Sequence, residues 1–227
     1  MLENTEIREW ADNLLKEVLE KWQSMKGRYD FHEYGFAVFY SPPYYNPELM
    51  LIGYNPGGRR DVFNPERDST ITSITGHEYF QNDYDYALAR KMRELFEGVR
   101  KTPLLRSSVK LNLNFFRSPT MADWKQIDLR VRRELESFCY RKVQEIVERL
   151  HPRCIIAEGM QTYQEVKSLL HAAPEKKEYQ QGIRGRAIYA RSTFNHHRLI
   201  GLIHPSGAHI SNDEWQRLAT YLQSDLA

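Results

Sequence analysis

Two short segments, distant in the chain, combine side chains that can bind a polar substrate with residues that form tight turns. The first segment reads Gly53, Tyr54, Asn55, Pro56 and Gly57. The second reads His204, Pro205, Ser206 and Gly207. An amide offers a hydrogen-bond donor and an acceptor together, and a neutral imidazole can donate one hydrogen bond. Because glycine, asparagine and proline also make ordinary turns, neither segment indicates a function by itself.

The two segments each follow an apolar run that predicts a buried strand. These runs lie at 49–53 and 198–203, and similar runs occur at 109–116 and 154–159. Continuous apolarity predicts strands covered on both faces, as in a parallel sheet. Helical patterns separate the runs, at 84–97, 128–150 and 162–171, and a further one at 213–223 closes the chain. We therefore expect an α/β fold whose strand C-termini meet at one edge.

The length of the chain sets its organisation. A chain of 227 residues is long enough for one well-buried core. We expect a single domain over 1–227, with an N-terminal helix at 6–26 and a core at 35–223. The run 35–40 ends at Ser-Pro-Pro and predicts an edge strand or an entry arm.

Composition excludes several classes of protein. Cys139 and Cys154 supply neither a four-thiolate cluster nor a Cys-x-x-Cys pair, so an iron–sulfur cluster and a disulfide framework are not expected. A reducing cytoplasm fits this cysteine usage. No apolar run reaches the ~18 residues of a membrane span. The motifs of P-loop NTPases and α/β-hydrolases are absent.

Charge is nearly balanced overall, with 32 basic and 30 acidic side chains, but it is unevenly distributed. The stretches 98–122 and 181–210 contain basic residues and no Asp or Glu. If they met on one face they would suit a polyanion. On charge alone, two unrelated solvated loops are the simpler interpretation.

Taken together and in this order, the two segments resemble the motifs of the uracil-DNA glycosylase superfamily. The family's first motif is Gly-x-(Asp/Asn/Glu/Ala)-Pro-(Tyr/Gly), and its second is (His/Asn)-Pro-Ser-(Pro/Gly). The form Gly-x-Asn-Pro-Gly is typical of the mismatch-specific and single-strand-selective branches. The segments lie about 150 residues apart, as in the family, and the resemblance covers about 49–215. It implies a three-layer α/β/α fold with a central four-stranded parallel sheet.

The resemblance implies a monofunctional DNA N-glycosylase, a hydrolase that removes uracil or a related damaged or modified base. Asn55 would position a water through its side-chain oxygen, and His204 would donate a hydrogen bond to the pyrimidine O2. A neutral amide is a poor general base, so such a site depends on electrostatics. The implied partner is DNA, with no cofactor, and we expect a cytoplasmic monomer.

Base recognition is implied for residues around the first segment. Asn112 or Asn114 would pair with the Watson–Crick edge of the base; counting back from Arg117 favours Asn112. Phe63 is the candidate for stacking on the flipped base, and Tyr54 could line the pocket or contribute a backbone amide. The remaining pocket residues are Gly53, Pro56 and Gly57. With Gly57 in place of tyrosine there is room beside C5, so thymine and 5-substituted pyrimidines stay open as substrates.

DNA contacts are implied for the loop that follows the second segment. Ser206 and the amides near Gly207 would hold phosphates. Ala208 occupies the place of the wedge that fills the gap left by an extruded base, and His209 or Ile210 could substitute for it. Further candidate phosphate contacts are Arg59, Arg117, Arg100, Lys101, Arg184, Arg186 and Arg191.

Other interpretations remain open at this point. The histidines at 196, 197, 204 and 209 could suggest a metal, but no carboxylate or cysteine lies near them in the chain, so we expect none. The chain could be an inactive nucleic-acid-binding protein of the same fold. It could also be an α/β enzyme acting on free nucleosides or nucleotides.

Overall fold

The predicted parallel strands lie together in one sheet of the computed structural model, which describes residues 2–55, 57–58, 60–81, 85–182, 185–206 and 209–226. They are β1 (Met50–Gly53), β2 (Val109–Asn112), β3 (Cys154–Glu158) and β6 (His197–Leu202). Their order is β2-β1-β3-β6, and each strand pairs in parallel with its neighbour. Every residue of β1, β2 and β3 is buried, as continuous apolar runs require.

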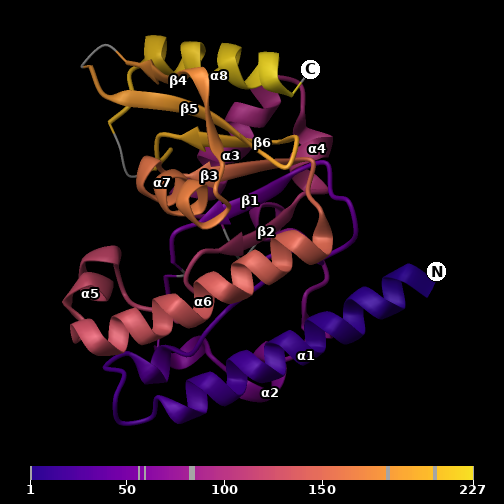
Figure 1. Ribbon diagram of the computed structural model, residues 1–227, viewed down its shortest axis with the longest axis vertical. Helices are drawn as coiled ribbons and strands as arrows, with labels where there is room; N and C mark the ends of the chain where they lie inside the picture. Colours follow the sequence, from indigo (N-terminus) through magenta and orange to yellow (C-terminus); the bar gives the residue numbers. More distant parts are fainter. Residues whose placement is uncertain are drawn as a thin grey trace.

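The sheet continues beyond β6 as an antiparallel hairpin. Strands β5 (Ala187–Phe194) and β4 (Ala173–Gln181) complete the order β2-β1-β3-β6-β5-β4. The α/β class is therefore confirmed, but the expected four-stranded parallel sheet is incomplete: within the described residues the sheet is mixed and has six strands. Figure 1 shows these strands following one another from β2 to β4.

The hairpin escaped prediction because β4 is largely polar and carries no apolar run. Its position is set by pairing rather than by its own sequence. A two-residue loop, Asn195–His196, joins β5 to β6, and both residues have positive φ, 45° and 67°. This is the backbone of a tight type I′ turn, whose twist matches that of the flanking strands. The run 35–40 adds only isolated antiparallel bridges to the other end of the sheet, Phe36 to Phe116 and Phe39 to Leu111.

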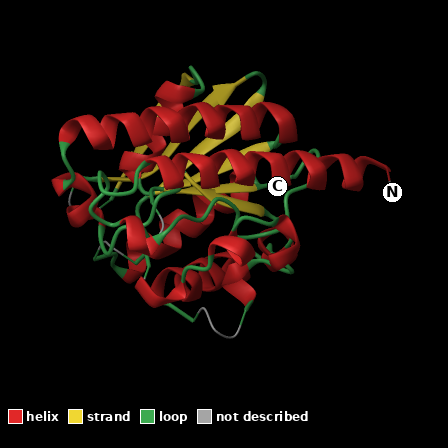
Figure 2. Ribbon diagram, turned by 90° about the horizontal axis from the view of Figure 1, so that it is seen from below, coloured by secondary structure: helices red, strands yellow, loops and turns green. Residues whose placement is uncertain are grey.

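Three helices cover one face of the sheet. They are α1 (Leu2–Ser24), α6 (Leu129–Leu150) and α7 (Met160–Leu169), whose apolar side chains join one buried cluster with Met50, Ile52 and Leu111. Helices α1 and α6 run side by side across this side of the molecule (Figure 2).

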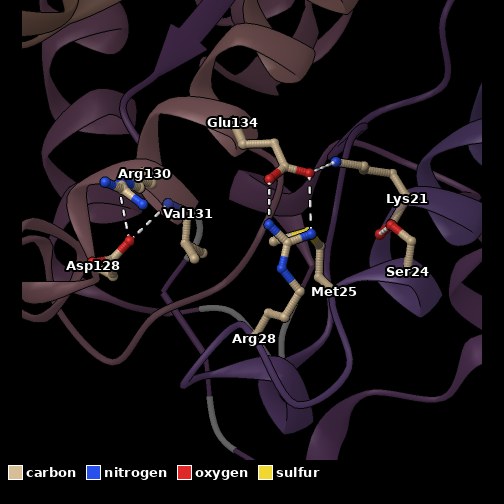
Figure 3. Close-up of polar contacts among 8 residues, drawn as sticks. All are labelled: Lys21, Ser24, Met25, Arg28, Asp128, Arg130, Val131 and Glu134. Carbon is tan, nitrogen blue, oxygen red and sulfur yellow. Dashed lines mark hydrogen bonds and ion pairs between the residues drawn. The ribbon is translucent and has the colours of Figure 1, made fainter.

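Ion pairs join α1 to α6 at the surface. Glu134 of α6 accepts from Lys21 Nζ at 2.5 Å and from Arg28 Nη2 at 2.6 Å (Figure 3). Both bonds hold the pKa of Glu134 below its usual value. Asp128 begins α6 by accepting from the backbone N–H groups of Arg130 and Val131. Because such exposed pairs contribute little, the apolar cluster beneath them is what holds α1 in place.

The opposite face is covered by α3 (Ala87–Gly98), α4 (Thr102–Arg106) and α8 (Asn212–Asp225), which share a second buried cluster with Leu51, Ile156 and Leu202. Successive strand residues alternate between the two clusters, as side chains along a strand must. Helices on both faces make three layers. The short elements are α2 (Pro65–Asp68), α5 (Met121–Gln126), η1 (His32–Tyr34), η2 (Arg60–Val62), η3 (Ile71–Ser73) and η4 (Glu78–Phe80). Both cysteines are buried free thiols.

Candidate active site

The two motif segments lie at one edge of the sheet. Asn55 follows β1 by two residues and His204 follows β6 by two residues, and both strands end at the same edge because they run parallel. Only β3 separates β1 from β6. Two strand spacings amount to about 10 Å, which leaves room for one nucleoside between the turns. The carboxyl edge of an open α/β sheet is where such folds bind ligands.

Asn55 is held by a side chain that the sequence did not single out. Its Nδ2 donates to Ser118 Oγ at 2.9 Å, and that hydroxyl donates to the carbonyl of Thr120 at 2.9 Å. Because the only hydrogen of Ser118 Oγ goes to Thr120, the hydroxyl can only accept from Asn55. The amide nitrogen must therefore face Ser118, and this fixes the direction of Oδ1. Ser118 is fully buried, so the support is rigid.

Asn112 and Asn114, the two candidates for reading the base, have different surroundings. Asn112 ends β2, and its Oδ1 lies so close to Gly53 that a Cβ there would come within 2.1 Å of it. The glycine that opens the first motif therefore makes room for the Asn112 amide. Asn114 lies beyond the strand, where its backbone N–H and Nδ2 both donate to the carbonyl of Tyr54 at 2.9 and 3.3 Å. Asn114 holds the turn, and Asn112 is the better candidate for reading a base.

His204 is half-buried beside Gly159, the residue that follows β3. A Cβ on Gly159 would lie 3.7 Å from His204 Cδ2, and the φ of this glycine is +119°, which disfavours any side chain. Ser206 Oγ lies 3.5 Å from His204 Nδ1. Burial lowers the pKa of His204, Lys110 lowers it further, and Glu158 opposes them. The imidazole is therefore neutral at neutral pH and retains one N–H to donate.

A buried charge network lies directly behind these residues. Lys110 Nζ is 3.2 Å from Glu78 Oε1 and 3.2 Å from Glu158 Oε2. Tyr79 donates to the other oxygen of Glu158, and Tyr86 donates to Glu78 at 2.8 Å. All three charged side chains are at most 8% exposed. Lys110 is thus not part of a positive surface, although it lies in an acid-free stretch of sequence.

The charge network of Lys110, Glu78 and Glu158 extends to Gly53 of the first motif and to Asn112. Glu158 Oε2 lies 3.2 Å from the place of a Cβ on Gly53, and Lys110 and Asn112 share one face of β2. Sequence reasoning missed this network. The available signal was a charge inside each of two apolar runs, Lys110 and Glu158. Buried charges of this kind are rare unless paired.

His77, next to the network, predicts a pH dependence of stability. Burial, with Lys110 and Arg106, lowers the pKa of His77 from 6.5 to about 3. As pH falls, His77 is therefore protonated in the unfolded chain before it is protonated in the folded protein. The free energy of unfolding decreases as pH falls from 6.5 towards 3. Lowering the pH from about 7 to about 4.5 should reduce the free energy of unfolding by about 2 kcal/mol through this residue.

Urea unfolding at both pH values measures this loss. His77→Asn retains a side chain that can accept from the Tyr79 N–H, as Nδ1 of His77 does, but does not titrate. We expect the variant to lose about 2 kcal/mol less than the wild type over the same pH change. Equal losses in the two proteins would contradict the assignment.

Two candidate base-binding side chains, Phe63 and Tyr54, point towards the face of the sheet that α1, α6 and α7 cover. Phe63 packs against the rings of Trp22 and Phe36, with centroids 5.0 and 5.1 Å away, and covers Gly35. The Tyr54 side chain packs against the cluster beneath α6, and burial there raises its pKa to about 12, with Glu136 and Glu165 adding to the shift. These contacts are structural. The stacking role of Phe63 is therefore unsupported by its position.

The candidate DNA-binding residues are only partly covered by the structure. Ser206 and His209 are exposed, and Gly57 is exposed with no atom within 4 Å of a Cβ placed there. The side chain of Arg117 lies over Gly58, 3.0 Å from a Cβ there. Ile210 packs against the cluster beneath α8. Outside the described residues lie Pro56, Arg59, Arg184, Gly207 and Ala208.

Arg186, directly before β5, adjoins the segment after the second motif, a proximity that the sequence did not predict. Arg186 Nη2 donates to the carbonyl of His209 and lies 3.5 Å from Glu214. Since β5 runs antiparallel to β6, Arg186 lies at the same edge as His204. The Arg191 side chain, in contrast, is paired with Asp225 at 2.6 Å.

Arg100 and Lys101, two of the further candidate phosphate contacts, lie at the edge of the sheet opposite to the Asn55 and His204 turns. They line a hollow of about 710 Å³ together with Arg153 and Arg198, at the amino ends of β3 and β6. The acid-free stretch 98–122 therefore does not gather on one face.

No family model matches the chain, and a search of curated proteins finds none that matches it. The residues that the structure describes contain no group of three or more His, Cys, Asp or Glu side chains that could hold a metal ion. In the same part of the chain, every helix is too short or too polar to cross a membrane.

Proposed function

We propose that this protein is a DNA glycosylase that hydrolyses the N-glycosidic bond of uracil or a related damaged or modified base. One observation carries the proposal: the Asn55 turn and the His204 turn lie at the same edge of the sheet, one strand apart. The resemblance of both turns to the uracil-DNA glycosylase motifs then gives each side chain a role.

In the proposed reaction a water adds to the anomeric carbon while the bond to the base breaks. Asn55 Oδ1 orients the water, since Ser118 fixes the amide from the other side. The bonding electrons leave with the base, and negative charge gathers on O2. The neutral His204 donates a hydrogen bond there, which stabilises the departing anion. The proton lost by the water goes to solvent, and the base takes up a proton after it leaves.

Asn112 supports recognition of the base. Its amide can donate to one group and accept from another, as the Watson–Crick edge of a pyrimidine requires. Its position against Gly53 keeps it near the Asn55 turn. The buried Lys110 and the carboxylate of Glu158 hold the floor of the site behind it.

An excision assay tests the proposal. Single-stranded and duplex oligonucleotides carrying uracil, hypoxanthine, a thymine mismatch or a 5-modified cytosine are incubated with the protein. Base release and alkali-sensitive abasic sites are then measured. We expect release of at least one of these bases without any added cofactor. A protein that binds these DNAs but releases none of the bases is an inactive member of the fold, and the proposal fails.

Salt dependence of binding separates DNA from small substrates. A protein that contacts DNA phosphates binds more weakly as salt rises, since counterions are released on binding. An enzyme for free nucleosides has no such contacts to lose. Affinity for an unmodified oligonucleotide that does not change between low and high salt would favour the nucleoside enzyme.

A further inference from the structure

The hollow at the amino ends of β3 and β6 is a concentration of positive charge remote from the candidate active site. Its cationic side chains come from separate segments, and the hollow, which is open to solvent, has a volume of about 710 Å³. Pockets for small ligands have volumes of this order. The cations are Arg100, Lys101, Arg153 and Arg198, and His196 also lines the hollow.

The acidic residues of the hollow do not neutralise these cations. Among the described residues, Arg100, Lys101 and Arg153 form no ion pair. The Asp225 carboxylate already accepts from Arg191 at 2.6 Å. Glu48 is the other acid in the lining. The hollow therefore keeps a net positive charge.

Two of the positions that line the hollow are held at a conformational cost. Arg100 follows α3 with a φ of 57°, and His196 is the second residue of the β5–β6 turn with a φ of 67°. Both positions favour glycine, because a left-handed backbone crowds any Cβ. Non-glycine residues in this region cluster at ligand sites, where the side chain is needed despite the strain.

The lining also offers an apolar part. Pro103, Leu104 and Leu226 lie beside the cations. Arginine side chains bind phosphate oxygens in pairs of hydrogen bonds, and apolar atoms can cover a ring attached to the phosphate.

We propose that this hollow binds a phosphate monoester of nucleotide size. Arg100, Arg153 and Arg198 hold the phosphate, and the Pro103–Leu104 side covers the attached group. The phosphate can belong to a free nucleotide or to the phosphorylated end of a DNA strand, and the two share this chemistry. The proposal does not depend on the function proposed for the carboxyl edge.

Calorimetric titration with dAMP tests it, with deoxyadenosine as the ligand without phosphate. We expect saturable binding of dAMP and binding of deoxyadenosine weaker by at least about tenfold, since a charged hydrogen bond is lost. Oligonucleotides with a 5′-phosphate or a 5′-hydroxyl identify the source. A 5′-phosphorylated oligonucleotide that binds more tightly than its 5′-hydroxyl counterpart, by a difference that Arg100→Gly removes, indicates a strand end. Equal affinities of the two oligonucleotides, with saturable binding of dAMP, indicate the free nucleotide.

Arg100→Gly separates binding from folding. It removes a cation but relieves the left-handed strain, so we expect about tenfold weaker binding of dAMP together with an equal or higher Tm. Arg153→Ala, at another exposed position, should weaken binding to a similar degree. The matched control is Arg133→Ala, an exposed arginine near the other end of α6, which should leave binding unchanged. Base release in the excision assay should be unaffected by Arg100→Gly.

The proposal is overturned if dAMP does not saturate the protein at about 10 mM and the 5′-phosphate does not raise the affinity of the oligonucleotide. It is also overturned if Arg100→Gly and Arg153→Ala both bind dAMP as the wild type does. Either result would leave the hollow as a solvated basic surface, whatever the excision assay shows.

Discussion

Replacing Asn55 or His204 by alanine should slow base release by about 100- to 1000-fold, the usual cost of removing one group that stabilises a transition state. In the proposed reaction, Asn55→Ala removes the oxygen that orients the water, and His204→Ala removes the N–H that meets the departing base. DNA affinity should change by less than about tenfold, because phosphate contacts supply most of it. Single-turnover release of base and direct binding titrations measure the two effects separately.

Control variants distinguish the loss of a catalytic group from a nonspecific effect of substitution on the fold. Asn13→Ala changes an exposed asparagine of α1, and His171→Asn changes an exposed histidine whose left-handed backbone asparagine also tolerates. Both controls should release base at the wild-type rate. If Asn55→Ala and His204→Ala also did so, the assigned chemistry would be wrong even if the protein were a glycosylase.

Replacing Lys110 by methionine should lower the free energy of unfolding by about 3–5 kcal/mol, as removal of one partner from a buried ion pair does. Methionine fills much of the same volume, so packing changes little. What changes is the charge: Glu78 and Glu158 would lose the ammonium 3.2 Å from each of them, in a site that solvent barely reaches. Urea unfolding monitored by circular dichroism measures the loss.

Lys91→Met is the surface control for this prediction. Lys91 pairs with Glu94 at 2.6 Å, but both side chains are about half exposed, so its loss should cost less than about 1 kcal/mol. Adding Glu158→Gln to Lys110→Met should restore part of the lost stability, because one uncompensated charge is then gone. Equal costs for Lys110→Met and Lys91→Met would show that the buried network does not hold the sheet together.

The network also links stability to the proposed chemistry. Lys110 lies on β2, which ends at Asn112, and Glu158 ends β3 directly before Gly159; β1 lies between these two strands. Opposite charges between these strands fix their ends relative to each other. A catalytic amide and imidazole gain from such support, since small displacements of the reacting groups slow a reaction strongly.

Much of the α/β fold was predictable from the amino-acid sequence alone. Apolar runs at 49–53, 109–116 and 154–159 contain β1, β2 and β3, and the run at 198–203 matches β6 to within one residue at each end. The helical pattern at 128–150 is α6 to within one residue. These predictions succeed because burial on both faces and helical periodicity leave local marks in a sequence. Order along the chain also sufficed to bring the Asn55 and His204 turns to one edge, since parallel strands share it.

Only the tertiary structure decided which of these residues meet. It separated Asn112 from Asn114, placed Ser118 on Asn55, turned Phe63 towards Trp22 and carried Arg100 to the opposite edge. It also added the polar β4–β5 hairpin and paired Lys110 with two distant glutamates. Each of these depends on contacts between segments far apart in the chain, and a local pattern of polarity carries no information about which distant group completes a hydrogen bond or balances a charge.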